Sequence, residues 1–305
     1  MKLHNSKQEF IDVITAASNH LNIHPAIIEK DYYVTLILKE LSAQIPGILF
    51  KGGTCLSKCF NVINRFSEDI DLSLDASHFT QSNKRNANKA VIRVCDTLGF
   101  IIDNRNQVEK HSHGTYNCYN IQYPHIFSNA ALKDFIKLEM VFIQKAYPDT
   151  IRPVHSIIEQ YLKSSGYQNI VNDFDLQPFD IIVQSLERTF VDKVFALCDY
   201  YLRKEELRQS RHIYDLKMLS DNINIYSLNT LIKDVRNDRL PNKTCLSAKD
   251  SIVISDILKK IVDEEYFKKD YEKVTIPLLS SKVSYNEAIG IIKTISENKI
   301  FDSCI

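Results

Sequence analysis

The sequence predicts an α+β protein in which residues 1–150 form a mixed sheet with flanking helices and residues 151–305 are mainly helical. Three observations support this division. The short apolar runs that we interpret as strands lie before residue 150. Segments with apolar residues three or four positions apart separate them, as expected for helices that cover a sheet. After Pro148 and Pro153 the helical spacing dominates.

The composition is that of a folded protein with a sizeable core. Hydrophobic residues make up 44% of the chain, and 38 basic residues balance 38 acidic ones. This balance gives no overall attraction to nucleic acid, although a local basic patch could provide one. No apolar run has the length of roughly 20 residues that spans a membrane, and the N-terminus does not begin a signal peptide. Because the seven cysteines include no CxxC pair, they suit reduced thiols, and we expect a cytoplasmic protein.

The first half begins with two predicted helices, residues 6–20 and 25–43. Pro25 fits the first turn of the second helix, and Ile28, Tyr32 and Leu36 repeat at helical spacing. Gly47 then breaks the chain before a short apolar strand, residues 48–50. The residues from 69 to 75 alternate strictly, which is typical of a strand with one polar face. The other predicted elements are helices at 54–63 and 83–98 and strands at 100–109, 116–124 and 135–143.

The second half consists of predicted helices at residues 154–165, 185–206, 211–220, 227–236, 250–264 and 283–297. On the helix at 185–206, Phe190, Val194, Leu197 and Tyr201 form an apolar stripe, and Lys193 lies at its edge. The ammonium group of Lys193 could therefore project into a cleft between the two halves. The alternative is a boundary lysine whose stem packs while its charge stays in water.

Gly52 and Gly53 stand between the strand at 48–50 and the following helix, in a chain that has only 7 glycines. Glycines at such a turn allow close approach of a ligand to the backbone. The helix that follows offers unpaired N–H groups to a phosphate. An ordinary strand-to-helix turn has the same appearance, so the glycine pair alone is a weak indication of a phosphate site.

Paired aspartates downstream strengthen this interpretation. Asp69 and Asp71 are two residues apart on a predicted strand, so both carboxylates project from one face. Mg²⁺ prefers such oxygen ligands together with phosphate oxygens. Glu139, on another predicted strand, could supply the third carboxylate of a metal site for phosphoryl chemistry. The alternative for the aspartates is a solvated polar face. Glu139 could be an ordinary sheet residue that faces water, or the base that accepts a hydroxyl proton.

Four stretches of the sequence resemble the AbiEii/AbiGii-type nucleotidyltransferase toxins, which are related to the MenT toxins and to the DNA polymerase β-like nucleotidyltransferase superfamily. They are residues 29–35 (EKDYYVT), 50–58 (FKGGTCLSK), 65–72 (RFSEDIDL) and, in the second half, 187–197 with 211–216 (ERTFVDKVFAL and RHIYDL). The chain departs from the family pattern in two places. Asp192 stands where the family has Glu, and Glu139 stands where an Asp is common in the superfamily.

The resemblance implies roles for individual residues. Asp69 and Asp71 would bind Mg²⁺, Lys193 would contact nucleotide phosphates, and Asp215 would complete the site from the helical half. Glu139 is a candidate for both the metal site and catalysis. The candidate residues for binding the nucleoside triphosphate (NTP) surround the glycine turn and precede the aspartates: Lys51, Gly52, Gly53, Thr54, Arg65 and Ser67. The basic residues in this set could equally be ordinary surface charge.

The function implied by the resemblance is a Mg²⁺-dependent toxin that transfers a nucleoside monophosphate from an NTP to an acceptor hydroxyl. The suggested acceptor is RNA, for instance a tRNA 3′ end, and the expected partner is an antitoxin in a toxin–antitoxin or phage-defence system. Two alternatives stay open at this point. The acceptor could be a protein or a small molecule, or the chain could be a non-catalytic nucleotide-binding module.

Overall fold

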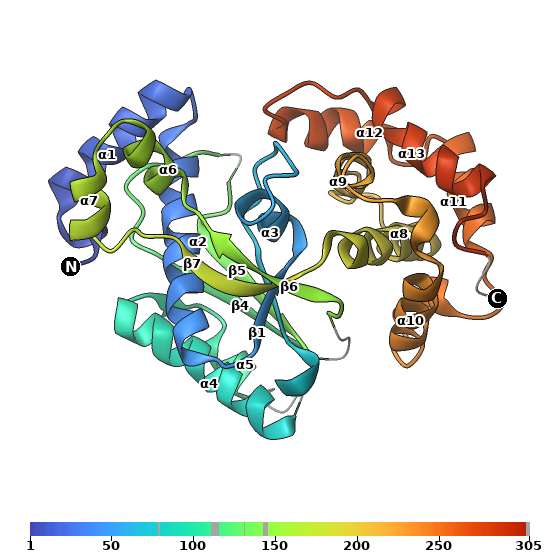
Figure 1. Ribbon diagram of the computed structural model, residues 1–305, viewed down its shortest axis with the longest axis horizontal. Coiled ribbons are helices and arrows are strands. Elements are labelled where there is room, and N and C mark those ends of the chain that lie inside the picture. The colour runs from blue at the N-terminus through green and yellow to red at the C-terminus, as the bar shows by residue number, and fades with distance from the viewer. Residues whose placement is uncertain (79, 111–115, 131, 143–145, 303–305) are drawn as a thin grey trace. The chain divides into compact units, whose positions relative to one another are not determined.

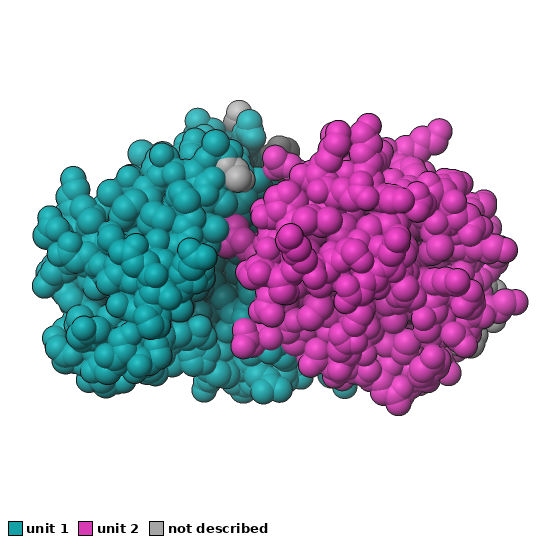
Figure 2. Space-filling model, turned by 90° about the horizontal axis from the view of Figure 1, so that it is seen from above, with its two compact units in different colours: residues 1–60, 67–183 teal, residues 61–66, 184–305 magenta. Residues whose placement is uncertain are grey.

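The protein is described by a computed structural model that covers residues 1–78, 80–110, 116–130, 132–142 and 146–302. The chain divides into two compact units, which Figure 2 shows in different colours. The first unit comprises residues 1–60 and 67–183, and the second comprises residues 61–66 and 184–305. The first unit thus continues past residue 150, at which we expected the first domain to end. The segment 61–66 belongs to the second unit, although its neighbours on both sides belong to the first.

The first unit is built on a seven-stranded mixed sheet with the order β3-β4-β5-β2-β1-β7-β6 (Figure 1). Strand β1 pairs with β2 in antiparallel and with β7 in parallel orientation, and β2 pairs in parallel with β5. The strands are β1 (Ile48–Lys51), β2 (Ile70–Leu74), β3 (Ile101–Ile102), β4 (Tyr116–Gln122), β5 (Phe135–Val141), β6 (Asp149–Val154) and β7 (Phe179–Gln184). The mixed sheet with its flanking helices confirms the predicted α+β class.

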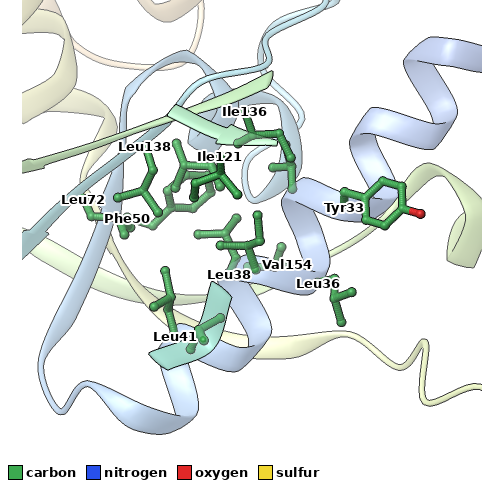
Figure 3. Close-up of a cluster of buried hydrophobic side chains, with 14 of the residues drawn as sticks. Tyr33, Leu36, Leu38, Leu41, Phe50, Leu72, Ile121, Ile136, Leu138 and Val154 are labelled. Carbon is green, nitrogen blue, oxygen red and sulfur yellow. The ribbon is translucent and has the colours of Figure 1, made fainter. Parts of the chain in front are cut away.

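Helix α2 (Pro25–Gln44) packs on this sheet and forms the centre of the first unit. Its first turn contains Pro25, and the ring of His24 accepts a hydrogen bond from the backbone N–H of Ala26. Figure 3 shows Leu38 and Leu41 of α2 beside Phe50 of β1, where burial of apolar surface holds helix and sheet together. The other helices of this unit are η1 (Leu3–Asn5), α1 (Lys7–Leu21), α3 (Gly52–Lys58), η2 (Ala76–His78), α4 (Gln81–Leu98), α5 (Arg105–Lys110), α6 (Ile157–Ser164) and α7 (Gln168–Asp173).

Two sequence predictions in the first half are wrong. The helix expected at 54–63 ends at Lys58, and Asn61 has a positive φ of 55°, which a helix cannot accommodate. Val62 and Ile63 are buried in the second unit instead. The strand expected at 100–109 is only β3, after which α5 begins. The side chain of Asn104 binds the backbone of β4 on both its donor and acceptor sides and so ends the strand pairing.

The sequence analysis also missed β6, α7 and β7. Strand β6 contains Pro153 and lies at the edge of the sheet, where a missing N–H is tolerated. The predicted helix at 154–165 is α6, which begins later, at Ile157. Strand β7 lies inside the sheet beside β1, and its apolar residues Ile181, Ile182 and Val183 are consecutive, so its sequence does not alternate as a half-buried strand would.

The second unit is helical, as predicted for this part of the chain. Phe190, Val194 and Leu197 of the expected apolar stripe on α8 are buried, while Tyr201 is half-buried. The helices are α8 (Leu186–Arg203), α9 (Arg211–Ser220), η3 (Ile225–Ser227), α10 (Asn229–Arg239), η4 (Leu246–Ala248), α11 (Ile254–Asp263), α12 (Lys268–Asp270), η5 (Tyr271–Thr275), η6 (Ile276–Leu278) and α13 (Tyr285–Glu297). In the part of the chain that the structure describes, no helix is long and apolar enough to cross a membrane.

Candidate active site

The register of two parallel strands brings a pair of predicted site residues together. Asp71 on β2 lies directly opposite Glu139 on β5, and their side chains share a hydrogen bond. Asp69 directly precedes β2, and its charge acts on Asp71. Burial, followed by the negative charges of Glu139 and Asp69, raises the pKa of Asp71 to about 7. Near neutral pH Asp71 is therefore only partly ionised.

The basic and phenolic groups around Glu139 keep that residue ionised. Burial opposes its charge, but hydrogen bonds from Lys137 and Tyr116 lower its pKa below the ordinary value. The Tyr116 hydroxyl donates to Oε1 of Glu139 at 2.6 Å, and the Lys137 ammonium pairs with the same carboxylate. Lys137 is two residues from Glu139 on β5, whereas Tyr116 lies on the neighbouring strand β4 and reaches Glu139 only through strand pairing.

Gly52 has a specific reason to be glycine. Its φ is +79°, and an added Cβ would lie 1.9 Å from Oδ2 of Asp71 and 2.8 Å from its Cγ. The close approach that we predicted for a phosphate is therefore made by the carboxylate of the site itself. Lys51, the preceding residue, pairs with Asp71 across β1 and β2, and its charge partly offsets the raised pKa. Gly53 follows in the first turn of α3.

Thr54 and Ser67 join the glycine turn to the aspartates. The hydroxyl of Thr54 is buried, donates to the backbone carbonyl of Asp69 at 2.5 Å and lies 3.0 Å from the Ser67 hydroxyl. These contacts fix the position of Asp69 relative to α3. The ammonium of Lys133, a residue that no sequence pattern indicated, lies 3.1 Å from Oδ1 of Asp69.

The chemistry of this cluster fits a hard divalent cation. Asp69, Asp71 and Glu139 offer only carboxylate oxygens, the ligands that Mg²⁺ prefers, and their mutual repulsion is what a cation relieves. Among the described residues, no group of three or more acidic, His or Cys side chains is already arranged around a common point. In this arrangement Oδ1 of Asp69 contacts the ammonium of Lys133.

Three further candidate residues form a buried cluster in the second unit. Asp215 on α9 is fully buried and accepts two hydrogen bonds of 2.7 Å from the guanidinium of Arg65 and a third, also 2.7 Å, from Lys193 on α8. Although burial opposes its charge, Arg65 and Lys193 hold the pKa of Asp215 well below the usual range. Burial lowers the pKa of Lys193 and, together with the charge of Lys193, that of His212.

The Arg65 contact also anchors the segment 61–66 within the second unit. The backbone N–H of Asn64 donates to the hydroxyl of Tyr214, and the backbone of Arg65 forms an isolated antiparallel β-bridge with Leu279. The stretch at 65–72 therefore has its arginine in the second unit and its aspartates in the first. That Lys193 and Asp215 complete a cleft with Asp69 and Asp71 stays a prediction.

Comparison with known proteins identifies relatives of this architecture. The family model of the nucleotidyl transferase AbiEii toxin, of type IV toxin–antitoxin systems, matches residues 36–284. The fold is similar to that of MenT4, the nucleotidyltransferase toxin Rv2826c from Mycobacterium tuberculosis H37Rv. The TM-score is 0.53 at 15% identity, with 95% of this chain and 89% of that chain covered. No curated protein sequence matches the chain.

We predict that Gly52→Ala destabilises the protein by about 2 kcal/mol or more, because the substitution adds a clash with Asp71 to the strain of a positive φ. Gly166→Ala is the matched control, since Gly166 has a φ of +82° and nothing within 4 Å of an added Cβ. The Gly166→Ala variant should lose only the stability that a positive φ costs a residue with a Cβ, about 1–2 kcal/mol. Urea denaturation measures both. Equal losses in the two variants would show that the carboxylate of Asp71 does not constrain residue 52.

We predict that Asp215→Asn destabilises the second unit by about 3 kcal/mol, because the change leaves two buried cations without their anion. Asp221→Asn on the same helix removes a carboxylate that is half-exposed and paired with Lys217, and should cost about 0.5 kcal/mol or less. Since the pKa of Asp215 is depressed in the folded state, its contribution is complete above the ordinary pKa of 3.8 and declines below it. The stability difference from wild type should therefore shrink between pH 7 and pH 2.5. A stable but inactive Asp215→Asn would instead assign Asp215 a direct role in catalysis.

Proposed function

The chain belongs to the AbiEii nucleotidyltransferase toxin family of type IV toxin–antitoxin systems, and from this premise we propose a Mg²⁺-dependent enzyme that transfers a nucleoside monophosphate to RNA. The observation that carries the proposal is the carboxylate cluster of Asp69, Asp71 and Glu139 beside the glycine turn. A cluster of like charges is a cost to the fold, and its retention is expected where catalysis needs it.

In the proposed reaction, the acceptor hydroxyl releases its proton to water while its oxygen forms a bond to the α-phosphorus of the NTP. The bond from that phosphorus to the bridging oxygen breaks, and pyrophosphate leaves. A divalent cation bound at the carboxylates would stabilise charge on the attacking and leaving oxygens. Asp69, Asp71 and Glu139 would hold the cation. The lowered pKa of Glu139 makes it a weak base, which supports a role as an ionised ligand.

The remaining candidate residues would position the NTP. We assign the triphosphate to the turn of Lys51, Gly52 and Gly53. For Thr54 and Ser67 we propose a supporting role, since their hydroxyls contact each other and the backbone of Asp69. Lys193 would contact phosphates only by leaving its present pairing with Asp215, and Arg65 shares that carboxylate. We therefore propose that Arg65 and Asp215 act mainly by organising the second unit.

A basic ridge on α4 supports a polyanionic acceptor. Arg85, Lys89 and Arg93 are exposed and follow one another at intervals of four residues, about 6 Å along the helix. The one acidic residue of α4, Asp96, pairs with Arg105. In a chain of zero net charge, such a ridge favours a phosphate backbone over a neutral small molecule. The acceptor we propose is a tRNA 3′ end.

The family also implies an antitoxin as partner. We propose that the protein acts in the cytoplasm, where NTPs and tRNA are available, and that it arrests growth until the antitoxin counteracts it, for example during phage infection.

The double substitution Asp69→Asn with Asp71→Asn is expected to abolish nucleotide transfer and toxicity, because it removes two of the three carboxylates. Each labelled NTP is incubated with total RNA, with protein extract and with small alcohols, and the label is followed into each fraction. Asp173→Asn with Asp180→Asn, which changes two exposed aspartates of the same unit, is the control and should retain full activity. Toxicity that survives the double change would overturn the mechanism, and label in protein or alcohol alone would overturn the RNA acceptor.

Replacement of Arg85, Lys89 and Arg93 by Gln is expected to weaken RNA binding about tenfold or more near physiological salt, and to make the salt dependence of log K shallower by about 2. NTP binding should not change. The control replaces three exposed lysines of the second unit by Gln: Lys269, Lys273 and Lys282. Fluorescence anisotropy with labelled tRNA at several salt concentrations measures both variants. Equal effects of the two triple changes would argue against α4 as the contact surface.

A further inference from the structure

Lys133 lies on the connection between β4 and β5 and contacts Asp69. Its ammonium is 3.1 Å from Oδ1 of the aspartate, and 28% of the Lys133 side chain and 15% of the Asp69 side chain are exposed. A ligand can therefore reach the pair. An ion pair so near the surface contributes at most about 1 kcal/mol to stability, so stability alone does not account for the construction around it.

Two consecutive charged residues of α2 hold this connection in place. The fully buried carboxylate of Glu29 accepts hydrogen bonds from the backbone N–H groups of Ile126 at 2.7 Å and Phe127 at 2.9 Å. Burial raises the pKa of Glu29. Keeping this carboxylate ionised, as the two hydrogen bonds favour, therefore costs free energy of desolvation.

Lys30 binds the other end of the connection. Its fully buried ammonium donates to the backbone carbonyl of Lys133 at 2.7 Å and to Oε2 of Glu68 at 2.5 Å. Glu68 directly precedes Asp69. The one buried ammonium of Lys30 therefore joins the backbone of Lys133 to the residue next to Asp69. The arrangement keeps a second, reachable ammonium at a constant place beside the carboxylate cluster.

The contact with Asp69 has to change when the site is loaded. If Asp69 becomes a ligand of a divalent cation, the ammonium of Lys133 faces a positive charge in place of a carboxylate, and the two repel each other. The side chain can turn while its backbone stays pinned by Lys30. The anion that arrives together with the cation is the triphosphate, and an ammonium is an effective point-charge partner for phosphate oxygens.

We propose that Lys133 is a phosphate-binding residue that pairs with Asp69 and exchanges this carboxylate for the phosphate chain of an incoming NTP. The inference rests on the proposed function, since it assumes that the nucleotide binds at Asp69, Asp71 and Glu139. It assigns Glu29 and Lys30 the task of positioning Lys133. The ion pair with Lys133 also offsets part of the negative charge that Asp69 adds to the carboxylate cluster.

The exchange predicts effects of opposite sign for Lys133→Gln. The variant removes the competitor for Asp69, so Mn²⁺ alone, titrated without nucleotide and followed by electron paramagnetic resonance of the free ion, should bind as tightly as to wild type or several-fold more tightly. The same variant should bind the magnesium nucleotide about tenfold to a hundredfold more weakly, the value of one charge-assisted hydrogen bond. Calorimetry with each of the four magnesium NTPs, of which the tightest wild-type ligand is used, measures this loss. Lys133→Arg should recover most of it.

Lys39→Gln is the matched control. Lys39 also belongs to the first unit, pairs with a carboxylate, that of Asp175, at 2.7 Å, and has 24% of its side chain exposed. This variant should change neither affinity. If Lys133→Gln weakens Mn²⁺ and nucleotide together, Lys133 is only structural. If nucleotide affinity is unchanged, it does not bind phosphate. Either result overturns the inference. If Asp69→Asn leaves wild-type nucleotide affinity intact, or no NTP binds, the proposed function fails as well.

Discussion

The parallel register of β2 and β5 is the constraint on which the site depends. It sets Asp71 against Glu139, and the neighbouring Asp69 adds a third negative charge. Burial and this repulsion raise the pKa of Asp71. Neighbouring groups accommodate these charges. Lys137 and Tyr116 stabilise the carboxylate of Glu139, and the absence of a Cβ at Gly52 leaves room for the Asp71 carboxylate. A sheet without these adjustments would favour neutral residues at these positions.

The sequence predicts those features of the site that depend on local periodicity, and it does not predict those that depend on tertiary packing. Alternation along the chain predicted strands for Asp71 and Glu139, which lie on β2 and β5, whereas Asp69 directly precedes β2. Which strands are neighbours, and in what register, depends on tertiary packing, so the contact of Asp71 with Glu139 could only be assumed. Gly52 was recognised as a point of close approach, but the approaching group is a protein carboxylate. Lys133 lies in a connection without periodicity and gave no signal.

The wrong and the absent secondary-structure predictions have a common cause. Ile63 follows Leu56 and Phe60 at helical spacing, yet it is buried in the second unit together with Val62, because Asn61 turns the chain away. Strand β7 was not predicted because its apolar residues Ile181, Ile182 and Val183 are consecutive and do not alternate with polar ones. In both cases the local pattern records burial correctly and does not record in which unit, or against which neighbour, the residue is buried.

Three successive charged residues in the first half of helix α2 make tertiary contacts that the sequence pattern alone does not indicate. Glu29, Lys30 and Asp31 lie about 100° apart around α2, so they cannot share one solvated face, and all three are buried. Glu29 and Lys30 hold the β4–β5 connection, while Asp31 accepts a hydrogen bond from the backbone N–H of Ile157 at 2.8 Å and pairs with Lys58 of α3. A charged run of this kind normally indicates a surface. Here each charge ties α2 to a different segment, and two of the segments so tied, α3 and the β4–β5 connection, carry residues that contact the aspartates. The position of the carboxylate cluster is therefore set as much by α2 as by the sheet that bears it.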